Sequence, residues 1–171
     1  MRALFDDLGP GVGTSLRKLY LARNKFGPVG AAALAAALSR GAMPQLEVMD
    51  LGANPLFSNG VTVLAAPLKT LRGLEELCLD DSDVGDEGVG SLLAGLGKDD
   101  FKNLKILLLD GNELTDGGCA KLVATLNSGA LPAIEQLLDG ATLSNHASSE
   151  ACKAVDDALS VRMWLREHKA E

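Results

Sequence analysis

The sequence predicts an α/β solenoid, a stack of similar units in which a short buried strand, a turn and an amphipathic helix recur. A leucine pattern starts at Leu16, Leu46, Leu74 and Leu104, so its steps are 30, 28 and 30 residues. The chain of 171 residues is 47% hydrophobic but only 4% aromatic, so its core is aliphatic, which suits equal stacked layers. One such unit cannot bury its apolar face alone, whereas stacked neighbours can.

The first half of each unit predicts a short strand. Leu77 and Leu79 alternate with polar neighbours, which is the period of a strand that is buried on one face. We therefore expect four strands whose matched apolar side chains lie in the core: Leu16, Leu19, Leu21; Leu46, Met49, Leu51; Leu74, Leu77, Leu79; and Leu104, Leu107, Leu109.

A polar residue follows each predicted strand, where the chain must turn. It is asparagine in three units, as Asn24, Asn54 and Asn112, and serine in the third unit, as Ser82. An amide side chain stacked on its equivalent in the next unit can bond backbone groups that the turn would otherwise bury unpaired. The shorter serine hydroxyl can do this only in part, so we expect the Ser82 turn to be the weakest.

The second half of each unit predicts a helix. Leu92 and Leu96 recur one helical turn apart, which places them on one stripe of an amphipathic helix. A glycine lies 14 positions after the first leucine of every unit: Gly30, Gly60, Gly88 and Gly118.

These units resemble the leucine-rich repeat, because the pattern LxxLxLxxNxL is followed by a glycine-led helix at 28 to 30 residues per unit. The unit length and the helix resemble the ribonuclease-inhibitor-like subclass. The resemblance implies a right-handed α/β horseshoe segment, with a parallel sheet on the concave face and helices on the convex face. It also implies a protein that holds other proteins, as most members of this class do.

We expect a single solenoid domain over residues 1–171. Residues 1–15 would form a partial N-terminal repeat, and residues 16–133 four full repeats. Residues 134–171 would form a degenerate fifth repeat and a C-terminal capping helix. Terminal repeats are expected to be atypical, because their outer face meets water.

The two ends depart from the repeat in different ways. Ile134, Leu137 and Leu138 begin the fifth unit, but Ala141 replaces its asparagine. At the N-terminal edge, three alternatives remain open: the solenoid continues in a longer chain, the first apolar residues meet a partner, or a short helix folds over the edge. The apolar residues concerned are Leu4, Phe5 and Leu8, and the capping helix near Ser149 carries the stripe Ala151, Val155, Leu159 and Met163.

The sequence shows no constellation for catalysis, a cofactor or a metal. His146 and His168 lack a matched Cys, Glu or second His at ligand spacing, and no GxSxG, GKS/T or HExxH motif occurs. Cys78 is expected beside Asp50 and Leu108, which would not activate a thiol, so we interpret it as a structural or merely exposed thiol. We predict a protein that is not an enzyme.

Composition disfavours several classes of partner. The net charge of −7 disfavours nucleic acid and anionic membranes, since both attract clustered Lys and Arg. Three cysteines without a CxxC pair favour a reducing compartment. No apolar run is long enough for a signal peptide or a membrane span. We therefore expect an intracellular, cytoplasmic protein without membrane insertion.

The register predicts which side chains the concave face of the sheet shows. Between the buried leucines, it presents acidic residues at 50, 76, 80 and 110 and apolar residues at 20, 48, 106 and 108. An apolar centre with an acidic rim suits a protein partner with a basic surface. The ascending loops and the convex helices are the alternative binding surfaces. The candidate partner-binding residues are Lys18, Tyr20, Val48, Asp50, Glu76, Asp80, Asp81, Ile106, Leu108 and Asp110.

The leading hypothesis is therefore a non-enzymatic module that binds another protein. Two alternatives belong to other classes. The chain could regulate an enzyme, as ribonuclease inhibitor and the Ran GTPase-activating protein of this subclass do. It could also be a structural subunit that joins a larger assembly through its N-terminal edge.

Overall fold

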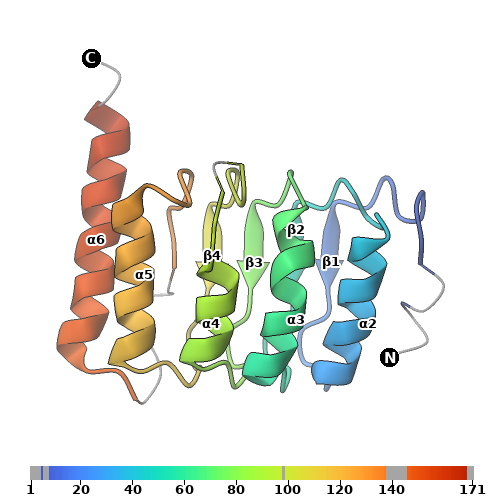
Figure 1. The fold of residues 1–171 in the computed structure, drawn as a ribbon, viewed down its shortest axis with the longest axis horizontal. Helices are drawn as coiled ribbons and strands as arrows, with labels where there is room; N and C mark the ends of the chain where they lie inside the picture. The colour runs from blue at the N-terminus through green and yellow to red at the C-terminus, as the bar shows by residue number, and fades with distance from the viewer. Residues whose placement is uncertain (1–4, 6–7, 98, 138–145, 169–171) are drawn as a thin grey trace.

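The computed structural model describes residues 5, 8–97, 99–137 and 146–168. Strands and helices alternate along the chain, and a long helix follows the last pair (Figure 1). The elements are β1 (Lys18–Tyr20), α2 (Pro28–Ser39), β2 (Val48–Asp50), α3 (Phe57–Lys69), β3 (Glu76–Cys78), α4 (Asp86–Leu93), β4 (Ile106–Leu108), α5 (Asp116–Ser128) and α6 (Ser149–His168).

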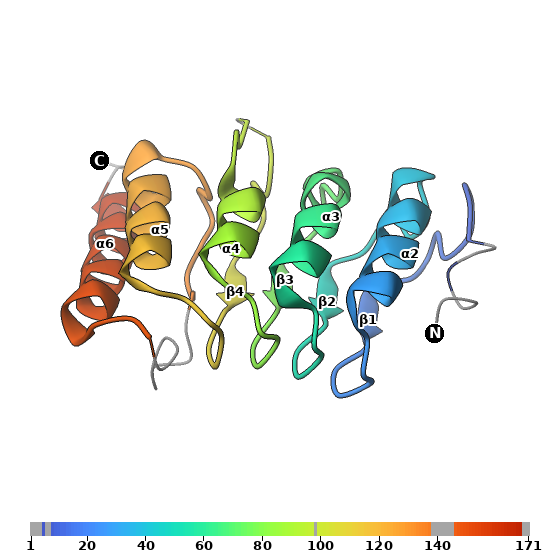
Figure 2. The ribbon, with the colours of Figure 1, turned by 60° about the horizontal axis from the view of Figure 1, so that its bottom comes forward.

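The four strands form one parallel sheet in chain order, β1-β2-β3-β4, and the helices lie in a single layer on one side of it (Figures 1 and 2). The register pairs Leu19, Met49, Leu77 and Leu107 across the sheet, which are matched residues of the sequence repeat. The predicted α/β solenoid is therefore confirmed. Among the described residues, no helix combines the length and the apolar character that crossing a membrane requires.

The core consists of the leucines of the repeat, as predicted. Leu51, Leu77, Leu79 and Leu109 are completely buried between the sheet and the helices. The first strand is the exception, because Leu16 and Leu19 are only half-buried. Within the described residues β1 pairs on one side only, so its leucines lack the second neighbouring layer that covers the others.

The repeated glycines lie in the first turn of their helices, and most of them pack closely against an apolar residue just before the helix. A β-carbon on Gly30 would lie 2.8 Å from a ring carbon of Phe26, and one on Gly88 would lie 2.7 Å from a methyl carbon of Val84. Both distances are too short for carbon atoms, so a side chain at Gly30 or Gly88 would displace its neighbours. A β-carbon on Gly60 would lie 3.5 Å from its nearest atoms, an ordinary contact, so close packing explains the glycine at Gly30 and Gly88 but not in every repeat.

Two asparagines join the turns of successive repeats. Oδ1 of Asn112 accepts hydrogen bonds from the backbone N–H groups of Ser82 (3.1 Å) and Val84 (2.9 Å), both in the preceding repeat. Its Nδ2 donates to the carbonyls of Leu79 and Leu109. Asn54 makes the equivalent bonds, to the N–H groups of Asn24 and Phe26 and the carbonyls of Leu21 and Leu51. The amides thus satisfy buried turn backbone across the repeat boundary.

The side chain of Ser82 does not bond across the repeat boundary as the asparagine side chains do. Its hydroxyl donates to the carbonyl of Asp80 in its own repeat (2.9 Å). The N–H of Leu56, which matches Val84 in the next repeat, donates to the carbonyl of Asn54 and not to a side chain of the following repeat. The local chain also differs, because Phe57 begins α3 with a φ of 54°. The expectation that this turn has the weakest connection agrees with these contacts.

One predicted helix is shorter than the leucine spacing suggests. Leu92 and Leu96 were expected on one helical stripe, but α4 ends at Leu93. Ala94 is already extended, and Gly95 has a φ of 60°, which ends the helix before Leu96. Leu96 is half-buried as part of the following loop.

At the C-terminal end, α6 begins at Ser149 and packs against α5 (Figure 2). Val155 of its predicted stripe is completely buried. Two guanidinium N–H groups of Arg162 donate to the carbonyls of Leu126 and Gly129, where α5 ends and would otherwise leave acceptors unpaired. The predicted fifth-unit residues Leu138 and Ala141 lie outside the described residues.

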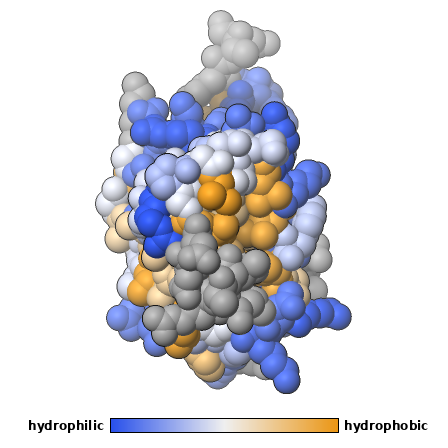
Figure 3. Space-filling model, turned by 90° about the vertical axis from the view of Figure 1, so that its right-hand side faces the viewer, coloured by the Kyte–Doolittle hydropathy of each residue, from blue (hydrophilic) through white to orange (hydrophobic). Residues whose placement is uncertain are grey.

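At the N-terminal end, Phe5 and Leu8 pack against the first repeat. Phe5 is buried, and its ring meets that of Phe26 edge-on at a centroid distance of 5.9 Å. Arg40 donates to the carbonyls of Phe5 and Leu8. These contacts favour the alternative in which the first residues fold over the edge; Leu4 lies outside the described residues. Apolar surface nevertheless remains visible at this end (Figure 3).

Candidate functional site

The face of the sheet opposite the helices gathers the side chains between the buried leucines. The backbone register aligns them in two columns, and the residues just after each strand extend them. We call this surface the sheet face. Its residues are Lys18, Tyr20, Val48, Asp50, Glu76, Cys78, Asp80, Asp81, Ile106, Leu108 and Asp110.

The sheet face is less exposed than the sequence suggests. Tyr20 is 62% exposed, and Lys18 and Asp81 are also exposed. Val48, predicted as an exposed apolar contact, is only 8% exposed, which corrects that expectation. Its short side chain is aligned between the longer side chains of Lys18 and Glu76 on the adjacent strands. The remaining candidates are half-buried: Asp50, Glu76, Asp80, Ile106, Leu108 and Asp110.

Acidic groups crowd around Cys78 at the centre of the face. The ligand atoms of Asp50, Cys78 and Asp80 all lie within 4.8 Å of one another, and Sγ of Cys78 donates to Oε1 of Glu76 at 3.6 Å. Gly52 makes this possible, because a β-carbon there would lie 2.9 Å from the carboxyl carbon of Asp80. Without a side chain on Gly52, the Asp80 carboxylate reaches across toward β2.

This crowding changes the protonation behaviour of two groups. Burial, and then the negative charges of Asp50, Asp81 and Asp110, raise the pKa of the Asp80 carboxyl, although its own backbone N–H opposes the shift. Burial, followed by the charges of Glu76 and Asp50, raises the pKa of the Cys78 thiol from 9.0 to about 12. Both effects disfavour an additional negative charge at this point of the surface.

Cys78 is therefore protonated at neutral pH and unsuited to act as a nucleophile, because the thiolate is the reactive form. Asp50, Cys78 and Asp80 are close enough to contact one cation. No other feature of the described residues points to a bound ion, so we assign no metal to them. The register predicts Asp50 and Leu108 as neighbours of Cys78, but it does not predict the approach of Asp80, which comes two residues after Cys78 in the chain.

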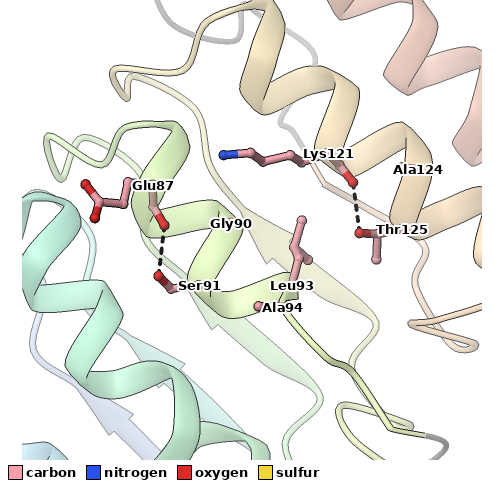
Figure 4. Close-up of a pocket in the computed structure, with 8 residues that line it drawn as sticks. All are labelled: Glu87, Gly90, Ser91, Leu93, Ala94, Lys121, Ala124 and Thr125. Atoms are coloured by element: carbon pink, nitrogen blue, oxygen red, sulfur yellow. Dashed lines mark hydrogen bonds between the residues drawn. The ribbon is translucent and has the colours of Figure 1, made fainter.

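A second hollow lies on the helix side, between α4 and α5 (Figure 4). It has a volume of about 510 Å³ and lies beside α4, which has 8 residues where α3 and α5 each have 13. Its polar side chains are engaged locally: Ser91 bonds the carbonyl of Glu87, Thr125 that of Lys121, and Lys121 that of Asp86. Since these groups do not converge on the hollow, the sheet face remains the stronger candidate site.

Comparison with known proteins agrees with the repeat and the fold. A family model described as "Leucine Rich repeat" matches residues 14–35. NACHT, LRR and PYD domains-containing protein 3 of Macaca mulatta is 33% identical over 133 residues, which are 74% of this chain. Ribonuclease inhibitor of Sus scrofa is 36% identical over 95 residues, or 56% of this chain. The chain is a leucine-rich-repeat protein of ribonuclease-inhibitor-like kind.

These leucine-rich-repeat relatives are much longer than the matched segment. The match spans 12% of the macaque protein and 20% of the porcine inhibitor. A solved structure, Leiomodin-1 Actin-Binding Site 2 (ABS2), superposes with a TM-score of 0.65 over 99% of this chain and 91% of that one. Its sequence identity is 12%, so this likeness supports the fold alone.

Proposed function

We propose that this leucine-rich-repeat chain is a non-enzymatic module that binds another protein through its sheet face. The observation that carries the proposal is the composition of that face. An exposed Tyr20 and the half-buried Ile106 and Leu108 lie beside charged groups, and none of the described helices covers them. Aromatic and aliphatic groups surrounded by charges are typical of protein contact surfaces.

The dimensions of the sheet face fit a protein segment better than a small molecule. Four strands about 4.8 Å apart make a strip roughly 15 Å across, which is open to one side. Metabolite sites are usually concave and enclose most of the ligand. A loop or an extended segment of a partner protein could lie across all four strands.

Charge reversal at the acidic side of the face tests the proposal. Binding partners would first be identified by cross-linking mass spectrometry in cell extract, and the purified partner would then be titrated by calorimetry. The variant D80K/D110K should weaken binding at least about tenfold, since it replaces two contact charges. Its melting temperature should not fall, because the pKa of Asp80 is already raised by burial and neighbouring carboxylates.

A variant with the same change in net charge serves as the control. E87K/D156K replaces exposed acidic residues on α4 and α6, away from the sheet. It should leave the affinity within about twofold of the original value, because exposed charges separated by more than about 10 Å are screened by salt. Equal affinity of D80K/D110K and the unaltered chain would move the interface to another surface.

The N-terminal end supports a second contact, by which the chain would join a larger assembly. Three of the exposed positions of α2 are apolar, namely Val29, Ala32 and Ala36. Figure 3 shows apolar surface gathered on the same end of the molecule. Stacking of another protein on this end would cover apolar area without obstructing the sheet face.

A further inference from the structure

The sheet face reverses its charge between the first and the third repeat. Three repeat positions outside the Arg17–Glu47 and Lys105–Glu75 ion pairs carry a base in the first repeat and an acid in the third. Lys18 and Glu76 are aligned through Val48 by the strand register. The other two pairs lie in the turns that follow the strands: Arg23 with Asp81, and Lys25 with Asp83.

The turn positions are equivalent in backbone as well as in sequence. Arg23 donates its N–H to the carbonyl of Gly52, and Asp81 donates its N–H to the carbonyl of Asp110, each in the following repeat. Both residues have positive φ angles, 59° and 49°. The two side chains therefore leave the chain at matching points of the solenoid, with opposite charges.

The basic end of the face is available for a partner. Lys18, Arg23 and Lys25 are exposed and form no ion pair with any described residue. Other bases near the sheet are engaged, such as Arg17 with Glu47 and Lys105 with Glu75. No acidic residue occurs from Thr14 to Gly27, so this end is uniformly basic.

The acidic end gathers carboxylates around Asp80. The carboxylates of Asp50 and Asp80 approach within 4.8 Å, and burial, followed by repulsion from Asp50, Asp81 and Asp110, raises the pKa of Asp80. A guanidinium or ammonium group placed among them would relieve this repulsion. Arginine suits the position best, because its planar fork can bond two carboxylates at once.

We propose that the sheet face binds a bipolar segment of its protein partner, with an acidic side chain against Lys18 and Arg23 and an arginine or lysine against the acids of β2 and β3. The inference rests on the proposed function and specifies the partner's chemistry. The two charges of the segment would lie about 10 Å apart, which is two strand spacings. In an extended segment this separation corresponds to about three residues, and Tyr20 would pack beside the acidic side chain, since it lies on the same strand as Lys18.

Selection from a random dodecapeptide display library tests the charge order. The unaltered chain should enrich peptides with one acid and one base about three residues apart, in one preferred order along the peptide. K18E/R23E replaces two of the three bases at the basic end by acids, so it should enrich peptides with two bases at that spacing. It should also bind the peptides selected on the unaltered chain at least about tenfold more weakly, measured by fluorescence polarisation.

A charge-swapped variant provides the decisive control. K18E/R23E/E76K/D81K keeps the net charge of the chain but removes the charge difference between the two ends, because Lys25 remains at one end and Asp50 and Asp80 remain at the other. It should therefore enrich peptides without a preferred order of acid and base. Folding of each variant is checked by circular dichroism, and K18Q/R23Q replaces K18E/R23E if the latter does not fold.

The outcomes separate this inference from the proposed function. Enrichment of uniformly basic peptides on the unaltered chain would overturn the bipolar segment but leave sheet-face binding intact. Peptides unaffected by every sheet-face variant, or no enrichment at all, would overturn both. A self-complementary dimer seen by sedimentation velocity, and lost in K18E/R23E, would show that a second copy occupies the face and would overturn the proposed partner.

Discussion

The turns at Ser82 and Asn112 occupy the same position in neighbouring repeats but make different connections. The Asn112 amide bonds backbone groups of both its own and the preceding repeat, whereas the Ser82 hydroxyl reaches only its own. The strands pair in the same register on both sides of Ser82. The leucines and the backbone ladder therefore hold the sheet in register without the amide, and the amide determines how the turns are joined.

A substitute contact appears where the serine is too short. Oγ of Ser58, at the start of α3, accepts a hydrogen bond from the N–H of Gly85 at 3.0 Å, and the N–H of Phe57 donates to the carbonyl of Ser82 at 3.1 Å. These bonds connect the second and third repeats outside the asparagine position. The second and third repeats are thus connected by other hydrogen bonds, and these lie closer to the surface than the bonds of the asparagine side chains.

The largest expected effect is that of Asn112→Ala. It leaves the buried N–H groups of Ser82 and Val84 without their acceptor, and each unpaired buried donor costs about 1–3 kcal/mol. We expect a loss of about 3 kcal/mol in the free energy of unfolding, measured by urea titration. Asn127→Ala, on the exposed side of α5, is the control and should change it by less than about 0.5 kcal/mol.

Two serine variants sharpen the comparison. Ser58→Ala removes the acceptor of the Gly85 N–H and should cost about 1 kcal/mol. Ser82→Ala should cost less, about 0.5 kcal/mol, because the carbonyl of Asp80 keeps the N–H of Ala53 as a donor. A loss for Ser82→Ala as large as that for Asn112→Ala would contradict the distinction between the two turns.

The smallest expected effect concerns Asp80, whose carbonyl is the acceptor of Ser82. Its side-chain pKa is raised in the folded chain by burial and neighbouring carboxylates, so ionised Asp80 opposes folding above that pKa. Asp80→Asn should therefore raise the melting temperature by about 1 °C at pH 7, a small effect because solvent screens the site. The gain in melting temperature should shrink as the pH falls toward the unfolded-state pKa. Thermal unfolding at several pH values measures this dependence. A gain that grew on acidification would have the wrong sign.

Most of the fold could be predicted from the sequence, because stacked units repeat their spacing. The strand columns, the buried leucines and the start of α6 near Ser149 follow from period alone. The burial of Val48 does not, since it depends on the length of side chains on adjacent strands. The approach of Asp80 to Asp50 likewise depends on the absence of a side chain at Gly52.

The candidate site was predictable in position but not in pattern. The register predicts which residues the sheet face presents. The composition of the face as a whole does not show that the charge reverses from Lys18 to Glu76, because the reversal depends on which strand carries each charge. The end of α4 at Leu93 was also missed, because leucine spacing outweighed the two glycines that follow. Local backbone geometry decided the length of this helix.

The asparagine bonds also impose an order on the growing chain. Asn54 supplies the acceptor for the N–H groups of Asn24 and Phe26, and Asn112 does the same for Ser82 and Val84. A ribosome releases the chain from its N-terminus, so each of these turns leaves the exit tunnel before the side chain that completes it. Every such repeat must wait, with its turn still bonded to water, for the next one to be translated.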